Sequence, residues 1–334
     1  MTGALDKPYG KMGFGMLRYS QQEIICAIDP DYAGKTTEEV TKIPRHCPVV
    51  ATVDEAAALG ADVLVVGIAP PGGQIPPEYV AEIDRAWNLG LSIVNGLHQV
   101  LGPTYNAPKR DGQYVWDVRV EPPGLTTSTG AASTLKAKRV LTVGSDMAVG
   151  KMTSGLELQK AALKMGLNCA FVATGQIGIC ITGSGVPLDG IRVDFACGAI
   201  ERECLKYADA DLIVIEGQGS LVHPSSTSPL PLLRGSMPTH LLFCHRAGQE
   251  GLLRFPEIRI PPIKQLTALF EDLGSCCGTY SRPRTAGVAL NCGHLSEEEG
   301  VEAVARFATE TGFLTLDPVR MDMSPMVKRI MGGV

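Results

Sequence analysis

The chain has 334 residues, of which 45% are hydrophobic and 19% charged, and its formal net charge at pH 7 is −5. This composition is typical of a soluble globular protein, and the length favours two domains that each enclose a core. A negative charge gives no reason to expect a nucleic-acid or anionic-membrane partner. The sequence has neither a signal-peptide pattern nor an apolar run of about 18 residues. We therefore expect a cytoplasmic protein with a small-molecule substrate, and we expect it to form a homo-oligomer.

Ten cysteines are scattered along the chain, and no two of them form a C-x-x-C pair. Most lie within apolar segments, where free cysteine behaves as a small hydrophobic residue. Because no tetrahedral ligand spacing is visible, we expect buried thiols rather than a zinc site.

The first third of the chain alternates short apolar runs with helical patterns. Alternation of this kind predicts a parallel sheet in a Rossmann-like arrangement, with the carboxyl ends of all its strands at one edge. Asp29, Asn95 and His98 follow predicted strands and would lie at that edge, where open α/β sheets bind ligands. Asp29 could hold a ribose hydroxyl, although no complete G-x-G-x-x-G precedes it. His98 is equally compatible with a hydrogen-bonded loop position.

Turn residues dominate the segment from Pro103 to Ala137, which also holds the alternating run YVWDVRV. We interpret this segment as a connector that carries one edge strand. The predicted domains are therefore a Rossmann-like domain with its connector at residues 1–135 and a second domain at residues 136–334.

The second domain begins with VLTVGSDMAVGKMTSGLELQ from Val140, a pattern that predicts a strand, a phosphate-binding loop and a helix. Gly144 and Gly150 lack a Cβ and can take the tight conformations of such a loop. Lys151 adds a positive charge beside the free N–H groups of the helix N-terminus. The predicted cofactor-binding residues are Gly144, Ser145, Asp146, Met147, Ala148, Val149, Gly150, Lys151, Met152 and Thr153, together with Gln176 and Asn291 at neighbouring strand ends.

This loop departs twice from the usual G-x-x-x-x-G-K-[ST] pattern. Five residues separate its two glycines, and Met152 stands where a Mg²⁺-binding hydroxyl normally follows the lysine. Thr153 comes one position late, about 100° further round the helix. The sequence therefore predicts anion binding without implying that a nucleotide is hydrolysed.

About six strands alternate with helices in this half of the chain. The most informative is DLIVI, because Glu216 follows it directly and precedes a Gly-Gln-Gly turn. A carboxylate at that position could hold a metal ion or its water shell beside the phosphate loop. A purely structural role, as a helix cap or in an ion pair, is the alternative.

The motifs GSDMAVGKMT and VIEGQGSL resemble the dethiobiotin synthetase branch of phosphate-loop proteins. A narrower resemblance covers nearly the whole chain. The segments GMLRY, NGLH, WDVR, GKMT, DFACGA, EGQGSLVHP and CHRAG, in this order, are similar to a family long catalogued as of unknown function. Its best characterised type is D-glutamate N-acetyltransferase. The resemblance implies a Rossmann-like N-terminal domain and a P-loop NTPase-like C-terminal domain.

The activity that this resemblance implies is transfer of an acetyl group from acetyl-CoA to the amine of a D-amino acid such as D-glutamate. Such a reaction needs a base, donors for the oxyanion and anchors for the substrate carboxylates. The candidates for the catalytic base are Glu216, Asp194, His223 and His245. The candidate carboxylate anchors are Arg192 and Arg246, whose forked guanidinium groups match a carboxylate.

Two other functions remain open. One is an ATP- and Mg²⁺-dependent ligase or carboxylase like dethiobiotin synthetase, with Lys151 on the phosphates and Glu216 on the metal. Met152 argues against it, because it cannot supply the metal-binding hydroxyl. The other is a nucleotide-binding module without turnover.

Overall fold

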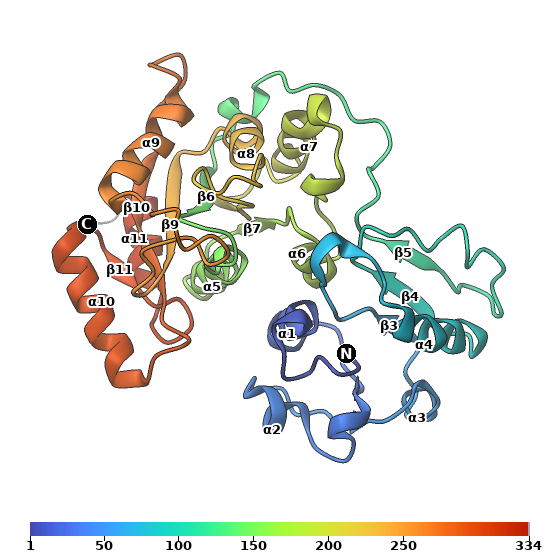
Figure 1. Ribbon diagram of the computed structural model, residues 1–334. Helices are drawn as coiled ribbons and strands as arrows, with labels where there is room; N and C mark the ends of the chain where they lie inside the picture. Colours follow the sequence, from blue (N-terminus) through green and yellow to red (C-terminus); the bar gives the residue numbers. More distant parts are fainter. Residues whose placement is uncertain (333–334) are drawn as a thin grey trace. The chain divides into compact units, whose positions relative to one another are not determined.

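The computed structural model describes residues 1–332, which form two compact units (Figure 1). The first unit contains Met1–Glu121 and Gln176–Gly190, and the second contains Pro122–Gly175 and the chain from Ile191 onward. All the strands of both units pair in parallel, and helices connect most of them. The expected α/β class with two parallel-sheet domains is confirmed.

The connector is divided at Glu121: its edge strand belongs to the first unit and residues 122–137 belong to the second, so the division comes earlier in the chain than the expected boundary at 135. Ser128 and Thr129 supply the physical reason. Their hydroxyl groups and the Thr129 backbone N–H donate to the buried Glu201 carboxylate at 2.8–3.0 Å. Glu201 lies in α7 (Val193–Leu205), so these bonds fasten the connector to a helix of the second unit.

The first unit has two separate parallel sheets where the sequence suggested a single one. Its strands are β1 (Ala27–Ile28), β2 (Val49–Val50), β3 (Val63–Val65), β4 (Ser92–Asn95) and β5 (Val115–Asp117). Its α-helices are α1 (Lys11–Tyr19), α2 (Thr37–Thr41), α3 (Val53–Ala58), α4 (Pro77–Asn88) and α6 (Gln176–Thr182). Single 3₁₀ turns occur at η1 (Pro8–Gly10), η2 (Pro30–Tyr32), η3 (Pro71–Gly73) and η5 (Leu188–Gly190). One sheet pairs β1 with β2, and the other has the order β3-β4-β5, with β5 as the expected edge strand.

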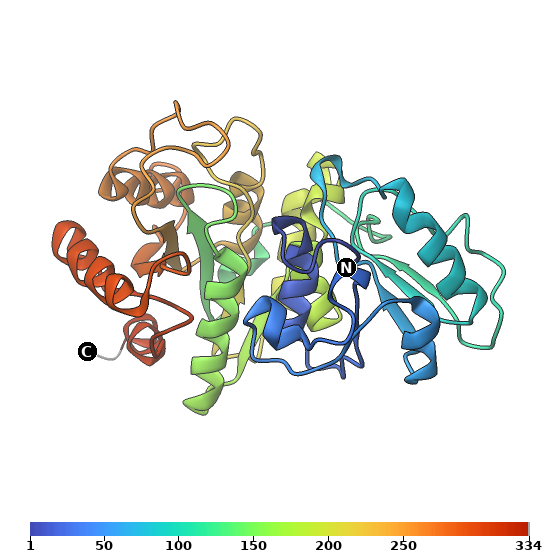
Figure 2. The ribbon, with the colours of Figure 1, turned by 60° about the horizontal axis from the view of Figure 1, so that its bottom comes forward.

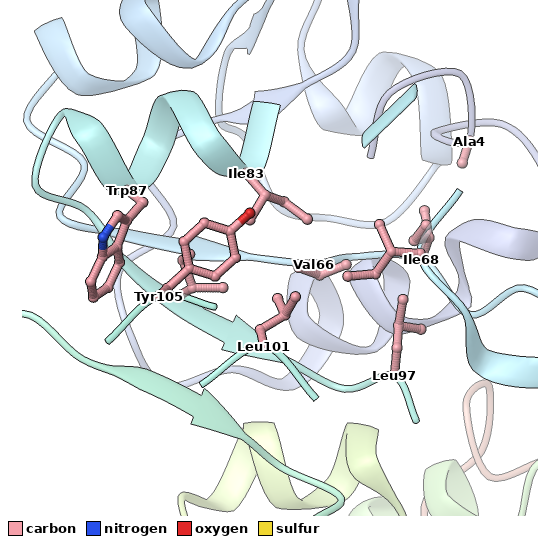
Figure 3. Packing of buried hydrophobic residues seen from close by; sticks show 10 residues of the cluster. Ala4, Val66, Ile68, Ile83, Trp87, Leu97, Leu101 and Tyr105 are labelled. Atoms are coloured by element: carbon pink, nitrogen blue, oxygen red, sulfur yellow. The ribbon is translucent and has the colours of Figure 1, made fainter. Parts of the chain in front are cut away.

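The main core of the first unit lies between α4 and the β3-β4-β5 sheet (Figure 3). Ile83 and Trp87 are four residues apart on α4 and therefore share one face of the helix. Both are buried, and the Trp87 ring lies 5.7 Å from the ring of Tyr105, centroid to centroid. The Tyr105 hydroxyl donates to Asp84 at 2.7 Å, which gives its polar end a partner at the edge of this core.

The second unit is built on a six-stranded parallel sheet with the order β11-β10-β9-β6-β8-β7. The strands are β6 (Lys138–Gly144), β7 (Cys169–Val172), β8 (Leu212–Ile215), β9 (His240–Arg246), β10 (Arg284–Asn291) and β11 (Thr315–Leu316). Every residue of β8 is buried, as expected for a parallel strand covered on both faces. The order places β8 next to β6, so that the ends of these two strands are neighbours.

Helices cover both faces of this sheet (Figure 1). They are α5 (Lys151–Lys164), α7, α8 (Pro229–Ser236), α9 (Ile263–Ser275), α10 (Glu297–Thr311) and α11 (Ser324–Met331), with a 3₁₀ turn at η4 (Ala131–Thr134). Figure 2 shows α5, the light-green helix, lying lengthwise along the green strand β6. Gly155 lets α5 lie close to β7 and β8, because a Cβ there would lie 2.9 Å from the Phe171 ring and 3.3 Å from Val214.

Helices α1, α6 and α8 are among those that lie where the sequence predicts no helix. Each contains residues that weaken a helical pattern: glycines in α1 and α6, and Pro229 and Pro231 in α8. The prolines are tolerated because they lie in the first turn, where backbone N–H groups have no partner within the helix. Packing stabilises the glycine-containing pair, since α1 and α6 lie against each other in the first unit.

Candidate functional site

The predicted phosphate-binding loop connects β6 to α5 in a tightly folded conformation. Gly150 has φ +101° and Ala148 has φ +56°, so the loop enters the left-handed region twice. Gly144 allows the turn itself, because a Cβ there would lie 2.8 Å from a Val149 methyl and 3.1 Å from the Cys244 carbonyl oxygen. The backbone N–H groups of Ala148, Val149 and Gly150 have no hydrogen-bond acceptor within residues 1–332. The loop therefore presents several donors to an anion.

Lys151 supplies the positive charge of this loop from a buried position. Its side chain is 7% exposed, and Nζ donates to the backbone carbonyl of Asp146 at 2.9 Å. Burial lowers the pKa of Lys151 to about 8, against the attraction of Cys244, Asp146 and Glu216, which raises it. The ammonium group is therefore still charged at neutral pH. A buried cation with a single hydrogen bond is well suited to a phosphate, which would compensate its desolvation.

No magnesium-binding hydroxyl occupies the position after the lysine, as the sequence indicates. Met152 lies there, and the hydroxyl of Ser154 donates to the Gly150 carbonyl at 2.9 Å. Among the described residues, no group of three or more His, Cys, Asp or Glu side chains could hold a metal ion. A metal-binding role for Glu216 stays a prediction.

Asp146 is anchored by the segment that follows β9, so its carboxylate has a structural role. Its Oδ2 accepts from Gln249 Nε2 at 2.7 Å and from the Leu253 backbone N–H at 2.8 Å. Its Oδ1 accepts from the Met147 N–H at 2.6 Å. The loop is thus shaped by residues about 100 positions further along the chain. A role of Asp146 in cofactor binding stays a prediction.

Glu216 lies at the end of β8 and is 3% exposed. Its Oε2 accepts the backbone N–H groups of Thr174 and Gly175 at 2.9 and 3.1 Å. Gly217 brings this strand end against β6, because a Cβ at Gly217 would overlap the carbonyl oxygen of Thr142. The Gly217 N–H also donates to the Thr142 hydroxyl at 2.8 Å. Glu216 is close enough to Lys151 to raise its pKa, so the structure brings the predicted carboxylate and cation together.

His245 is buried beneath the loop at the end of β9. Its Nδ1 lies 2.8 Å from the hydroxyl of Ser145, and its ring stacks at a tilt on Phe307 of α10, with the centroids 5.4 Å apart. Burial lowers the pKa of His245 to about 4, so the imidazole is neutral at physiological pH. His245 also lines an open cavity of about 310 Å³, together with Gln249 and the segment Arg259–Ile263.

His223 lies in the loop after β8, and its neighbours connect it to the phosphate loop. The Ser220 hydroxyl donates to the Ser145 carbonyl at 3.0 Å, which joins the two loops. The His223 ring meets the ring of Phe255 edge-on at 5.4 Å between centroids. Ser220, Gln249 and Leu253 are site-forming residues that the sequence did not identify. Only Ser220 had a local signal, as the serine that ends the Gly-Gln-Gly turn.

Of the other predicted site residues, Asn291 and Arg246 end neighbouring strands near the loop, whereas Asp194 and Arg192 lie at the start of α7. Asn291 ends β10 beside Gly150, and Arg246 is its register partner on β9. Asp194 is exposed in the first turn of α7, and the Arg192 guanidinium stacks on the ring of Phe195 at 4.8 Å. These positions leave all four as predictions.

Gln176 begins α6 in the first unit, where its Cγ lies next to Gly96, and its role in cofactor binding stays a prediction.

Residues predicted at the strand ends of the first unit stabilise its turns. The buried Asp29 carboxylate accepts the backbone N–H groups of Leu5 and Asp31. Asn95 donates to Asp117 at 2.7 Å, and His98 Nε2 lies 2.6 Å from Arg119. These contacts favour the structural interpretation of Asp29 over a ribose-binding one.

No helix in the described part of the chain is long and apolar enough to span a lipid bilayer.

Comparisons with known proteins agree with this architecture. Residues 126–327 match the P-loop domain described as a domain of unknown function, DUF1611_C, and residues 30–121 match its Rossmann-like counterpart, DUF1611_N. A crystal structure of a DUF1611 family protein from Anabaena variabilis is 44% identical to this chain, with a TM-score of 0.95. The similarity covers 98% of this chain and 97% of that one.

Two curated relatives are named D-glutamate N-acetyltransferase. The protein from a Pseudoalteromonas species is 34% identical over 84% of this chain and 84% of its own length. The protein from Tritonibacter scottomollicae is also 34% identical, over 80% of this chain and 81% of its own length. The chain therefore belongs to the DUF1611 family, with a Rossmann-like N-terminal domain and a P-loop C-terminal domain.

Proposed function

We propose that this protein is an N-acetyltransferase that moves the acetyl group of acetyl-CoA to the amine of a D-amino acid such as D-glutamate. The names of the two curated relatives support the reaction type. The observation that carries the proposal for this chain is the phosphate loop, which combines a buried cation at Lys151 with Met152 in the place of the metal-binding hydroxyl. Such a loop is suited to holding phosphates without cleaving them.

Coenzyme A fits the groups that this loop offers. Its pyrophosphate and 3′-phosphate are anions, and the loop provides the unpartnered N–H groups of Ala148, Val149 and Gly150 beside the Lys151 ammonium group. These residues would hold a phosphate of the acetyl donor and so fix the position of its thioester. Binding energy gained at a remote phosphate can contribute to catalysis by orienting the reacting group.

A single assay tests the proposal. The purified protein is incubated with acetyl-CoA and each member of a panel of D- and L-amino acids, and release of the CoA thiol is followed. We expect thiol release that depends on a D-amino acid, with an acidic side chain preferred. Absence of thiol release with every amino acid of the panel would refute the proposed activity.

An ATP-dependent ligase or carboxylase is the second candidate, and the proximity of Glu216 to Lys151 favours it. A carboxylate beside a phosphate loop can hold Mg²⁺ or its water shell. The same panel with ATP and Mg²⁺ in place of acetyl-CoA, followed by phosphate release, tests this alternative. Phosphate release without thiol release would favour the ligase over the acetyltransferase.

A further inference from the structure

The protonation of the His223 ring is fixed by its backbone neighbour. The Ser225 backbone N–H donates to His223 Nδ1 at 3.1 Å. A backbone N–H can only donate, so Nδ1 must hold its lone pair toward Ser225. In a neutral imidazole the remaining hydrogen then belongs to Nε2. His223 is therefore an Nε2–H donor and has no free lone pair with which to accept a proton.

This Nε2–H group is without an intramolecular acceptor. His223 is 4% exposed, yet within residues 1–332 its Nε2 has no hydrogen-bond partner. Nε2 is also not fully buried, so it keeps some access to solvent. In the neutral ring this accessible atom is a hydrogen-bond donor.

Two contacts join the segments on either side of this ring to the phosphate loop. Ser220, three residues before His223, donates to the Ser145 carbonyl. On the other side of the ring lies Phe255, whose near neighbour Leu253 donates its N–H to the Asp146 carboxylate. His223 is thus held between two segments that are each bonded to the loop.

We propose that the Nε2–H of His223 is an oxyanion donor of this site and that His223 is not the general base. This inference rests on the proposed acetyl transfer. The substrate ammonium first releases one proton to solvent, and the free amine attacks the thioester carbon. A C–N bond forms, and the electron pair of the C=O π bond moves onto oxygen, where the His223 Nε2–H donates to it. When the C=O bond re-forms, the C–S bond breaks, and the nitrogen loses its surplus proton as the CoA thiolate gains one.

A matched pair of variants separates a donor from a base and from a structural residue. His223→Gln places an amide N–H near the position of Nε2 but loses the Nδ1 acceptor. His223→Asn keeps an acceptor for the Ser225 N–H but has no group at Nε2. If His223 is a donor, His223→Asn lowers kcat about 10²-fold or more, as loss of an oxyanion donor does elsewhere, and His223→Gln retains most of the activity.

Other outcomes would overturn the proposal. If His223 were a base, both variants would lose activity equally, and the acidic limb of the wild-type pH profile of kcat would be absent from both. If its role were structural, His223→Asn would be the more active of the two variants. The shift of the melting temperature that CoA produces shows that each variant is folded and still binds.

The tautomer has a readout that does not depend on activity. ¹⁵N NMR of the imidazole distinguishes a hydrogen on Nε2 from a hydrogen on Nδ1, and we expect the neutral ring to carry it on Nε2. A hydrogen on Nδ1 would refute the inference whatever the enzyme does. Conversely, a wild type that releases no thiol would refute the proposed function and leave the tautomer measurement standing.

Discussion

Replacing Lys151 with methionine should stabilise the ligand-free protein while removing its affinity for phosphates. Burial lowers the pKa of Lys151 from 10.5 to about 8. Since one pKa unit corresponds to about 1.4 kcal/mol, keeping this ammonium charged in the folded state costs about 3 kcal/mol. Methionine has a similar length and no charge, but it leaves the Asp146 carbonyl without its donor, at a cost of about 1 kcal/mol. The net expectation is a gain of about 2 kcal/mol at pH 7.

The gain should depend on pH in a defined direction. Between pH 8 and 10.5 the unfolded wild-type chain binds more protons at this lysine than the folded chain does, so wild-type stability rises with pH in this range. The advantage of Lys151→Met is therefore complete below pH 8 and disappears as the pH approaches 10.5. Urea unfolding at pH 7 and pH 9.5 measures both ends of this trend.

Ligand binding gives the opposite result for the same variant. Loss of a charge-assisted hydrogen bond to phosphate should weaken CoA binding about 10-fold or more. The control is Lys160→Met on the same helix, because Lys160 is exposed and makes only a surface ion pair with Glu157. This control should change stability by less than about 1 kcal/mol and leave CoA affinity unchanged. If Lys151→Met is less stable than the wild type at pH 7, or binds CoA equally well, then the lysine is not a desolvated phosphate ligand.

Two further predictions concern the strand ends around the loop. His245→Asn should make the protein less sensitive to acid. Burial holds the pKa of His245 near 4, against about 6.5 in the unfolded chain, so this group lowers wild-type stability by more than about 2 kcal/mol between pH 7 and 4.5. If urea unfolding shows the same loss of stability in the variant and the wild type over this range, the prediction is wrong. Gly217→Ala should cost about 3 kcal/mol or more in thermal unfolding, because its Cβ would overlap the Thr142 carbonyl. The control is Gly166→Ala, because Gly166 has a left-handed backbone but open space around it, and this variant should cost about 1 to 2 kcal/mol. If Gly217→Ala costs no more than this control, steric overlap at Gly217 is ruled out.

Local patterns predicted the parts of the site that depend on neighbours in sequence. The strand, loop and helix around Lys151 follow from an apolar run, two glycines and a helical period, and the structure has them in β6 and α5. The position of Glu216 beside this loop follows from the rule that parallel strands end at one edge. The sequence does not specify that β8 is the neighbour of β6. The close approach of these two strand ends requires a glycine at position 217, because a Cβ there would overlap the Thr142 carbonyl.

Features that depend on contacts formed only in the folded chain could not be predicted from local sequence patterns. The Asp146 carboxylate looked available to a ligand, but Gln249 and Leu253 occupy it from about 100 residues away. The tautomer of His223 depends on the hydrogen bond from Ser225, a local contact that only the folded turn reveals. Likewise, no period or composition indicated that Gln176 would start a helix of the first unit, because that placement depends on its packing partner α1.

The segment Gln176–Gly190 belongs to the first unit, and this affects how the chain folds during synthesis on the ribosome. Helix α6 packs against α1, but about 160 residues separate the two in synthesis order. The N-terminal unit therefore cannot complete its packing until residues up to 190 have left the ribosome, and β6, α5 and β7 of the other unit leave it before them. Strict one-after-another folding, in which the N-terminal domain finishes first, is not available to this chain.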